Sequence, residues 1–448
     1  MDARTAQSSA SPFASEREAD STPPLARALE MLYAHRGNPS GELARLLTDD
    51  PRNVSAHCLR AALIVQSDDV AARAIVAASV AAILALRPDE HDRANRHARA
   101  AHAWLAGDAV LALERYGAIV VDWPHDFVAL TVAHALDFRL GRRRMLRDRV
   151  ARVLPAWHAS MPGYAGVLAM YAFGLEENGR YRRAERFARR ALALDPRHPA
   201  AIHTTAHVME MQGRAREGLA FLDATETSWS DGTGFAIHLA WHRALFQLDS
   251  DDTASALATY DTKIATTQAP SMSALADASA LLWRLQLRGI DVAARWRVLA
   301  DRWALQALDG TRPFYPVHAM MAFAAAGDAG PAARLLGGLR AAYPSSRACL
   351  PPEEALAQPL CEALLAFARS DYAACVELLT KVRDFADRCG GSVAQCDIVH
   401  LTLTEAALRA RRSTLARALV AERAARKPMS RLNGLLRQRA WRMMPAPA

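Results

Sequence analysis

Apolar and polar residues recur along most of the chain with the spacing of helices, and strand-like alternation is nearly absent. The stretch YAFGLEENGRYRRAERFARRALALDP, residues 171–196, shows the pattern most clearly. Apolar residues fall three and four apart on both sides of the turn NGRY, and the second run ends at Asp195-Pro196. Because proline cannot continue a helix, this pattern predicts two antiparallel helices that cross closely at small residues such as Ala184 and Ala191.

The same turn recurs along the chain at intervals from about 34 residues to the low forties, which is the range of helix-hairpin repeats. Turns are expected at Gly107-Asp108, Gly141-Arg142, Gly179-Arg180, Gly213-Arg214, Asp251, Gly289, Gly327-Asp328, Ser370-Asp371 and Arg411-Arg412. An earlier hairpin is expected over residues 54–87. Small residues at the helix crossing and a proline after the second helix make this the tetratricopeptide pattern.

A single hairpin of this kind leaves one apolar face exposed, and stacking on the next hairpin buries it. We therefore predict an all-α fold of tetratricopeptide-like helix-hairpin repeats in a right-handed superhelix, an α-solenoid, over residues 25–448. The last helix is expected to cap the array, and no independent second domain is expected. The first helix of each hairpin should line the inner wall. Residues 1–24 are polar, and we expect them to form a disordered tail.

Two histidine pairs repeat with the period of the hairpins. AIHTTAH at 201–207 and AIHLAWH at 236–242 each place two histidines four residues apart, and the two strings begin 35 residues apart. Counted back from Gly213, His203 and His207 fall on the face that lines the groove of a tetratricopeptide array, and Glu210 follows one turn later. The turn after His242 comes about three residues late, close to one helical turn, so the same face should survive.

A wall formed by these residues could do chemistry in two ways. Histidines at i and i+4 share a helix face and can both reach one metal ion, so His203, His207, His238 and His242 are candidate ligands. Without a metal, His207, His238 and His242 could act as general acids and bases beside Glu210, with Glu176 from the preceding first helix as a further candidate. The plain alternative is that the imidazoles only pack the groove.

Other residues are weaker candidates for a binding role. His97 falls at the same register position as His203, and His318 opens a later first helix. Glu226 and Trp229 end a second helix, where capping and packing are the usual roles. The binding candidates are His97, Asp137, Tyr171, Trp229, Trp241 and His318.

Composition narrows the function classes. The chain of 448 residues is 51% hydrophobic and carries a net charge of +8, almost wholly from arginine, since Lys263, Lys381 and Lys427 are the only lysines. The arginines are scattered among acids without interleaved aromatics, so nucleic acid is not expected as a partner. The longest apolar run, 74–86, is too short to span a bilayer. The six cysteines form no CxxC pair, and the N-terminus has no apolar signal core, so we expect a reduced, cytoplasmic protein that contacts no membrane.

Four stretches are distinctive: residues 147–229, HLAWHRALFQLDSDDTASALATYD, VHAMMAFAAAGD and LARALVAERAARKP. Through these stretches the chain resembles the tetratricopeptide repeat protein 38 family from about His57 to Lys427. The family pattern that stands here comprises His97, Asp137, Glu176, His207, Glu210, Glu226, Trp229, His238, His242 and His318. The chain departs from it at Asn95, where an acid is usual, and near Ser250 and Ser370, where glycines are usual. The resemblance implies the repeat fold and gives weight to the histidine groove, but it transfers no activity.

Two functions of different classes therefore remain. The first is an enzyme that binds and transforms a small-molecule metabolite in a groove lined by histidine and glutamate, with or without a divalent metal; hydrolysis, lyase chemistry and oxidation are all open. The second is a scaffold that binds a peptide or protein segment, as most tetratricopeptide proteins do. The usual peptide-carboxylate clamp has lysine, arginine and asparagine where this chain has histidine, glutamate, alanine and aromatics, so we favour the enzyme. No phosphate-binding glycine loop, GxSxG elbow or dinucleotide fingerprint is present.

Overall fold

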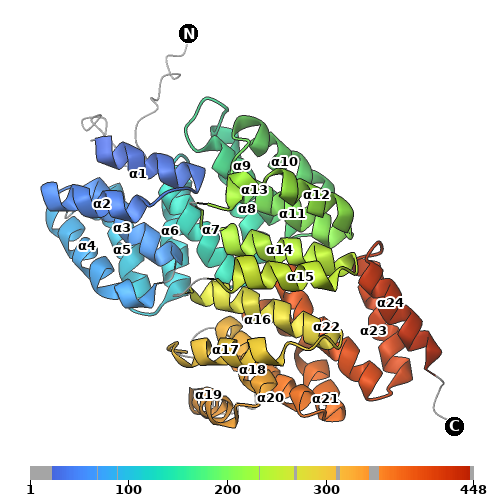
Figure 1. Ribbon diagram of the computed structural model, residues 1–448. Helices are drawn as coiled ribbons and strands as arrows, with labels where there is room; N and C mark the ends of the chain where they lie inside the picture. The colour runs from blue at the N-terminus through green and yellow to red at the C-terminus, as the bar shows by residue number, and fades with distance from the viewer. Residues whose placement is uncertain are drawn as a thin grey trace. The chain divides into compact units, whose positions relative to one another are not determined.

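The computed structural model describes residues 23–443 except 68, 88, 232, 267–269, 309–312 and 343–352. Within those residues the chain forms 24 α-helices and no strand, so the predicted all-α fold is confirmed (Figure 1). The predicted tail 1–24 lies outside the described residues except for Pro23 and Pro24, which begin the first helix. None of the described helices has the length and apolar character needed to cross a bilayer.

Every predicted hairpin turn is present, and all nine share one geometry. At Gly213 the backbone is left-handed, with φ of 71°. The Gly213 N–H donates to the backbone carbonyl of Glu210, and the Arg214 N–H donates to the backbone carbonyl of Met209. This pair of bonds satisfies the last carbonyls of the first helix, and glycine is favoured at the left-handed residue because it has no Cβ. Asp251, Ser370 and Arg411 take the same left-handed φ at their own turns, so three turns keep the geometry without glycine.

The contacts of the chain divide it into two compact units, 1–205 with 227–234, and 206–226 with 235–448. Helix α11 (Pro199–Gln212) and helix α13 (Glu226–Trp229) contribute residues to both units. The prediction of one continuous array without an independent second domain stays a prediction.

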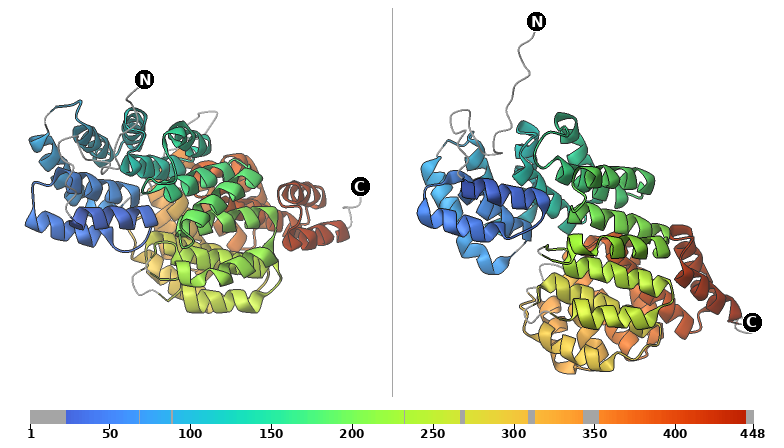
Figure 2. Two further views of the ribbon diagram at one scale, coloured as in Figure 1. Left: turned by 90° about the horizontal axis from the view of Figure 1, so that it is seen from above. Right: turned by 45° about the horizontal axis from the view of Figure 1, so that its top comes forward.

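The first unit is built from hairpins of neighbouring helices (Figure 2). Its helices are α1 (Pro23–Ala34), α2 (Pro39–Asp49), α3 (Val54–Ser67), α4 (Arg73–Leu86), α5 (Arg93–Leu105), α6 (Ala109–Asp122), α7 (Phe127–Arg139), α8 (Arg143–Val153), α9 (Tyr164–Glu176) and α10 (Tyr181–Leu194), with 3₁₀ turns η1 (Val70–Ala72) and η2 (Leu154–Ala156).

In the first unit, each helix packs on the next in the chain, and first helices also pack on first helices, as α3 does on α5 and α7. Close crossings depend on small residues: a Cβ added at Gly174 of α9 would lie 2.5 Å from the Leu146 backbone oxygen of α8. Helix α1 folds back against α9, and the Tyr33 ring meets Phe127 edge-on with 4.9 Å between ring centroids. These contacts bury the N-terminal helix against the middle of its unit.

The second unit continues the pattern with longer and less regular hairpins. After α11 come α12 (Ala215–Ala224), α14 (Ala236–Asp249), α15 (Thr253–Thr259), α16 (Met272–Leu287), α17 (Ala293–Ala304), α18 (Phe314–Ala326), α19 (Ala329–Ala342), α20 (Ala357–Ala368), α21 (Tyr372–Val382), α22 (Val393–Arg409), α23 (Ser413–Arg426) and α24 (Arg431–Arg442), with a π-turn η3 (Tyr260–Ile264) and 3₁₀ turns η4 (Glu353–Leu356) and η5 (Arg383–Cys389).

Within the second unit the helices pack in chain order, and α22 also returns to pack on α16. The Trp283 indole N–H of α16 donates to the Thr402 hydroxyl of α22 over 2.9 Å, and Arg409 donates to the Leu287 carbonyl over 3.1 Å. The turn between α23 and α24 then contacts the end of α14, where the Ser430 hydroxyl donates to Asp249 over 2.6 Å. Residues far apart in sequence are therefore adjacent at α14 and α16.

Candidate functional site

The second unit brings three of the predicted histidines together at the junction of α11 and α14. The His207 and His242 ring centroids lie 4.5 Å apart, and those of His238 and His242 lie 4.8 Å apart. The expected approach of His207 to His242 across neighbouring hairpins is therefore present, although the turn that follows α14 comes late. Both of these side chains are fully buried, and they do not lie exposed on an open wall. We call His207, His238 and His242 the histidine cluster.

Two carboxylates, from different helices, hold two of these imidazoles. Glu210 of α11 accepts from His242 Nδ1 over 2.8 Å, and Asp277 of α16 accepts from His238 Nδ1 over 2.9 Å. A carboxylate bonded to Nδ1 fixes the tautomer in which Nδ1 carries the proton, so that Nε2 carries the lone pair. Metal-binding histidines are held in this way by their carboxylate partners.

Charge around the cluster favours neutral imidazole at His242 and ionised carboxylate at Glu210. Burial raises the pKa of Glu210, but the Lys427 ammonium at 3.1 Å and the His242 hydrogen bond outweigh burial and hold that pKa well below its usual range. Burial and the neighbouring His207 lower the pKa of His242 to about 3. At His238 burial also lowers the pKa, but Asp277 outweighs it, and the net direction is upward.

An aromatic and cationic layer lies beside the cluster. His238 stacks on Trp241 with 5.2 Å between ring centroids and 14° between the planes, and the Arg284 guanidinium lies 5.3 Å from the Trp241 ring centroid. Arg284 is itself held by the carbonyls of Ala280 and Ala394, each at 3.0 Å. Trp241, a predicted binding residue, is therefore a buried support for the His238 ring, because its exposed fraction is 0%.

The geometry of the cluster can hold a metal ion. One candidate ligand atom from each of His207, His238 and His242 lies within 4.8 Å of the other two. Three imidazole nitrogens suit zinc, iron, nickel or copper, and zinc–nitrogen bonds of about 2.0–2.1 Å would draw them closer. His203, the fourth predicted ligand, lies one turn before His207 on α11, on the part of that helix that belongs to the first unit.

The predicted site residues of the first unit are buried and have partners of their own. His97 Nε2 lies 2.9 Å from Asp126, the residue that caps α7. Asn95, which stands where the family has an acid, donates to the Arg87 carbonyl. Asp137 accepts from Arg149 at 2.7 and 3.3 Å, and the Tyr171 hydroxyl accepts from Arg183 at 3.1 Å. These contacts join neighbouring helices.

The remaining predicted residues differ in burial and in the partners they contact. Glu176 is the last residue of α9 and is 1% exposed, and Trp229 is buried in α13, both in the first unit. His318 of α18 donates from Nδ1 to the Phe314 carbonyl of its own helix at 2.7 Å, and burial lowers its pKa to about 4. Glu226 pairs with Lys263 at 2.9 Å on the surface.

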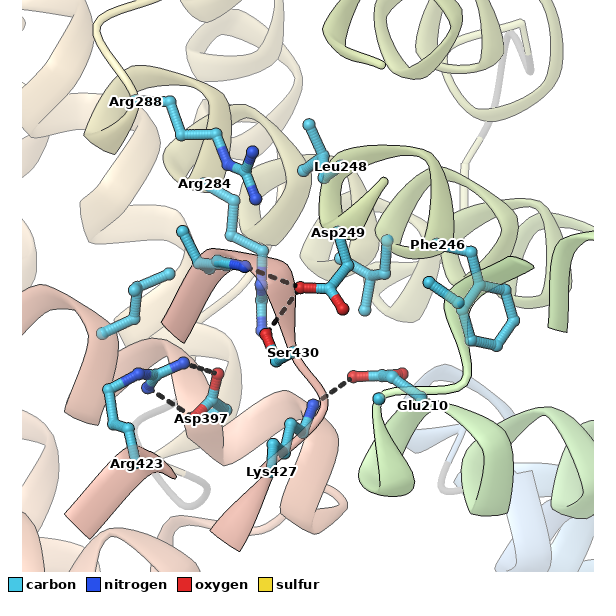
Figure 3. Close-up of a pocket in the computed structure, with 15 residues that line it drawn as sticks. Glu210, Phe246, Leu248, Asp249, Arg284, Arg288, Asp397, Arg423, Lys427 and Ser430 are labelled. Carbon is cyan, nitrogen blue, oxygen red and sulfur yellow. Dashed lines mark hydrogen bonds and ion pairs between the residues drawn. The ribbon is translucent and has the colours of Figure 1, made fainter. Parts of the chain in front are cut away.

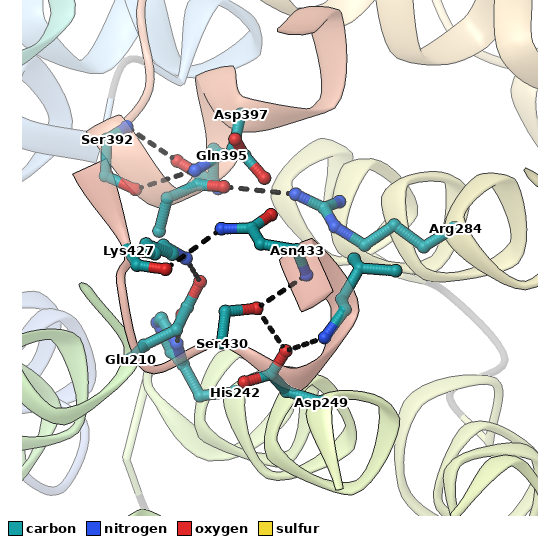
Figure 4. A network of polar contacts seen from close by, with 12 residues as sticks. Glu210, His242, Asp249, Arg284, Ser392, Gln395, Asp397, Lys427, Ser430 and Asn433 are labelled. Carbon is teal, nitrogen blue, oxygen red and sulfur yellow. Dashed lines mark hydrogen bonds and ion pairs between the residues drawn. The ribbon is translucent and has the colours of Figure 1, made fainter. Parts of the chain in front are cut away.

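Sequence reasoning missed two residues that the structure places at the cluster, Asp277 and Lys427. Lys427 follows α23 and reaches Glu210, which lies 217 residues earlier (Figure 4). The available signals were the single carboxylate of the largely apolar segment SALADASALLWRL, and one lysine among only three in an arginine-rich chain. A buried carboxylate requires a partner, so Asp277 pointed to one.

A pocket adjoins the cluster on the side of Glu210 and Lys427 (Figure 3). Its walls come from the ends of α11 and α14, from the starts of α12 and α24, and from α16, α22, α23 and the turn after α23. Its cavity volume is about 50 Å³, and the space around it that is open to solvent brings the total to about 550 Å³. None of the three clustered histidines lines the pocket. Glu210 lines the pocket and is also bonded to His242 of the cluster.

Comparison with known families adds no assignment. No protein-family model matches this chain. The resemblance to the tetratricopeptide repeat protein 38 family therefore stays a prediction that rests on the sequence motifs.

Proposed function

We propose that the chain is a right-handed tetratricopeptide-type superhelix whose second unit binds a divalent transition metal at His207, His238 and His242 and uses it to act on a small molecule. One observation carries the proposal. Glu210 and Asp277, from different helices, hold the Nδ1 atoms of His242 and His238, and these two imidazole rings lie against each other. His203, one turn away on α11, is the fourth ligand that the sequence predicts.

The protonation states favour a metal over acid–base catalysis at His242. A group with a pKa of about 3 is neutral near pH 7, which is the form that binds metals, and it is a weak base there. In the absence of a metal, His238, whose pKa is raised, is the better candidate for proton transfer. A bound metal would polarise a substrate oxygen or lower the pKa of a bound water to about 7. Glu210 and Asp277 would orient the imidazoles.

A peptide-binding scaffold is the alternative. In that case the helical stack would recognise an extended segment by surface contacts. The burial of His207 and His242 disfavours it for this cluster, because fully buried side chains cannot contact a docked peptide. A peptide site would have to use other residues.

Metal analysis of the purified protein tests the proposal. We expect about one equivalent of zinc, iron, nickel or copper after reconstitution, lost in His207→Ala and His242→Ala. His318→Ala is the matched control, because His318 is another buried histidine of the same unit whose Nδ1 bonds to its own helix. Asp277→Asn should weaken metal affinity about 10–100-fold, the range for lost carboxylate partners of metal-bound histidines.

Metal content is the readout because a change in stability cannot distinguish a metal-binding histidine cluster from one that only packs the helices. Buried polar partners left unpaired cost about 1–3 kcal/mol whether or not a metal binds. A protein that takes up none of these metals, or a His242→Ala variant that binds as much as the parent, would refute the metal site. A metal-free protein that binds peptides would support the scaffold.

A further inference from the structure

We propose that the pocket beside Glu210 binds the anionic group, a phosphate or a carboxylate, of a small ligand. The inference rests on the proposed function for what happens to that ligand, since it names the substrate class of the same site. The chemistry of the pocket walls carries it.

Cations outnumber carboxylates in the pocket. Arg284, Arg288, Arg423 and Lys427 line it, against Glu210, Asp249 and Asp397 (Figure 3). A concave wall with an excess of one charge sign, set in a low-dielectric surrounding, concentrates ions of the opposite sign. Because all seven side chains come from the same unit, the excess belongs to one compact body.

The three carboxylates are already bonded. Asp397 accepts from both terminal nitrogens of Arg423, at 2.7 and 3.0 Å. Glu210 offers one oxygen to Lys427 and the other to His242. Asp249 accepts from the Ser430 hydroxyl at 2.6 Å and from a backbone N–H at 3.3 Å.

Arg288 is the cation with the weakest bonding. Its side chain is only 15% exposed, yet among the described residues its one ion pair is with Asp251 at 3.9 Å, beyond hydrogen-bond distance. A guanidinium has five N–H donors in a planar fork that matches phosphate and carboxylate oxygens. Figure 3 shows the Arg288 side chain entering from α16, with Lys427 across the pocket.

The position of Glu210 connects this pocket to the histidine cluster. Its carboxylate lines the pocket and also holds His242. A ligand whose anionic group lies between Arg288 and Lys427 therefore has Glu210 as a neighbour. Through Glu210, the charge of a bound anion would act on the hydrogen bond that holds His242.

Binding of inorganic phosphate and of succinate to the full chain tests the inference. Each anion is titrated at constant ionic strength, with chloride as the reference, by calorimetry and by the midpoint of thermal unfolding. The measurement is made on the protein as purified and again after removal of metal by a chelator. We expect saturable binding of at least one anion in both samples, weakened at least tenfold in Arg288→Gln. Phosphate alone would indicate a phosphorylated ligand, and succinate alone a carboxylate ligand.

Arg295→Gln is the control, because Arg295 is an arginine of the same unit that bonds to Asp261 on the surface. It should bind both anions like the parent. Absence of binding by both anions, or equal binding by Arg288→Gln and the parent, would overturn the inference. Metal content is measured on the same samples: anion binding without any metal removes only the metal proposal, and metal without anion binding removes only this inference.

Discussion

Lys427→Met should destabilise the protein far more than the loss of an ordinary lysine. The ammonium of Lys427 lies 3.1 Å from Glu210, and the two side chains are 13% and 9% exposed, so neither charge is screened well by water. Removing one partner of a buried pair leaves the other charge uncompensated and typically costs about 3–5 kcal/mol. His242 still donates to Glu210 in the variant, so we expect a loss near the lower end, about 3 kcal/mol. Methionine keeps the apolar contacts of the lysine stem.

The chain supplies a matched control in Lys263→Met. Lys263 also pairs with a glutamate, Glu226, at the similar distance of 2.9 Å, but these side chains are 48% and 37% exposed. Exposed pairs contribute about 0–1 kcal/mol, so this variant should unfold almost like the parent. The two substitutions remove the same group from pairs of the same chemistry, and the difference between them measures burial.

Urea unfolding followed by circular dichroism at pH 7 gives both free-energy changes, and a double-variant cycle tests the cause. Glu210→Gln removes the charge that Lys427 neutralises, so the combination with Lys427→Met should cost less than the sum of the single changes by about 1–3 kcal/mol. Additive single effects, or a Lys427→Met loss no larger than that of Lys263→Met, would refute the reasoning.

Three further predictions concern the rest of the chain. Burial lowers the pKa of His134 to about 3, so the unfolded state binds the proton more readily and stability should fall as pH drops from about 6.5 toward 3. In unfolding curves measured at each pH, His134→Leu should reduce this loss of stability. An unchanged dependence on pH would contradict the prediction. Arg411→Gly should raise the unfolding free energy by about 0.5–1 kcal/mol, because Arg411 is strained at φ 56°, and a loss would show that its side chain matters more. Limited proteolysis should yield no pair of large fragments that each refold alone, if the two units are one array.

The repeat could be predicted from the sequence because its turns are local. The left-handed residue and the two hydrogen bonds that close the turn lie within six residues. A glycine such as Gly107 or Gly213 therefore predicts the turn without knowledge of the rest of the chain. The period then places His207 and His242 on neighbouring helices with no knowledge of the rest of the chain. Local rules were sufficient for these features.

The partners of those histidines could not be predicted in the same way. Asp277 and Lys427 reach the cluster from α16 and from the end of α23, and their positions depend on how later hairpins pack back on earlier ones. The burial of the cluster also depends on that packing, which is why an exposed groove wall was expected. A periodic count gives the direction of a side chain but not the elements that will cover it.

The place of Lys427 in the chain has a consequence for biosynthesis. Glu210 emerges from the ribosome 217 residues before the lysine that neutralises it, so a nascent chain holds α11 and α14 long before their counter-charge exists. Until then, Glu210 must stay hydrated or share a proton with His242. The histidine cluster therefore reaches its final electrostatic state only after the last hairpin has been synthesised. A chain truncated before residue 427 would carry the cluster without the counter-charge of Glu210.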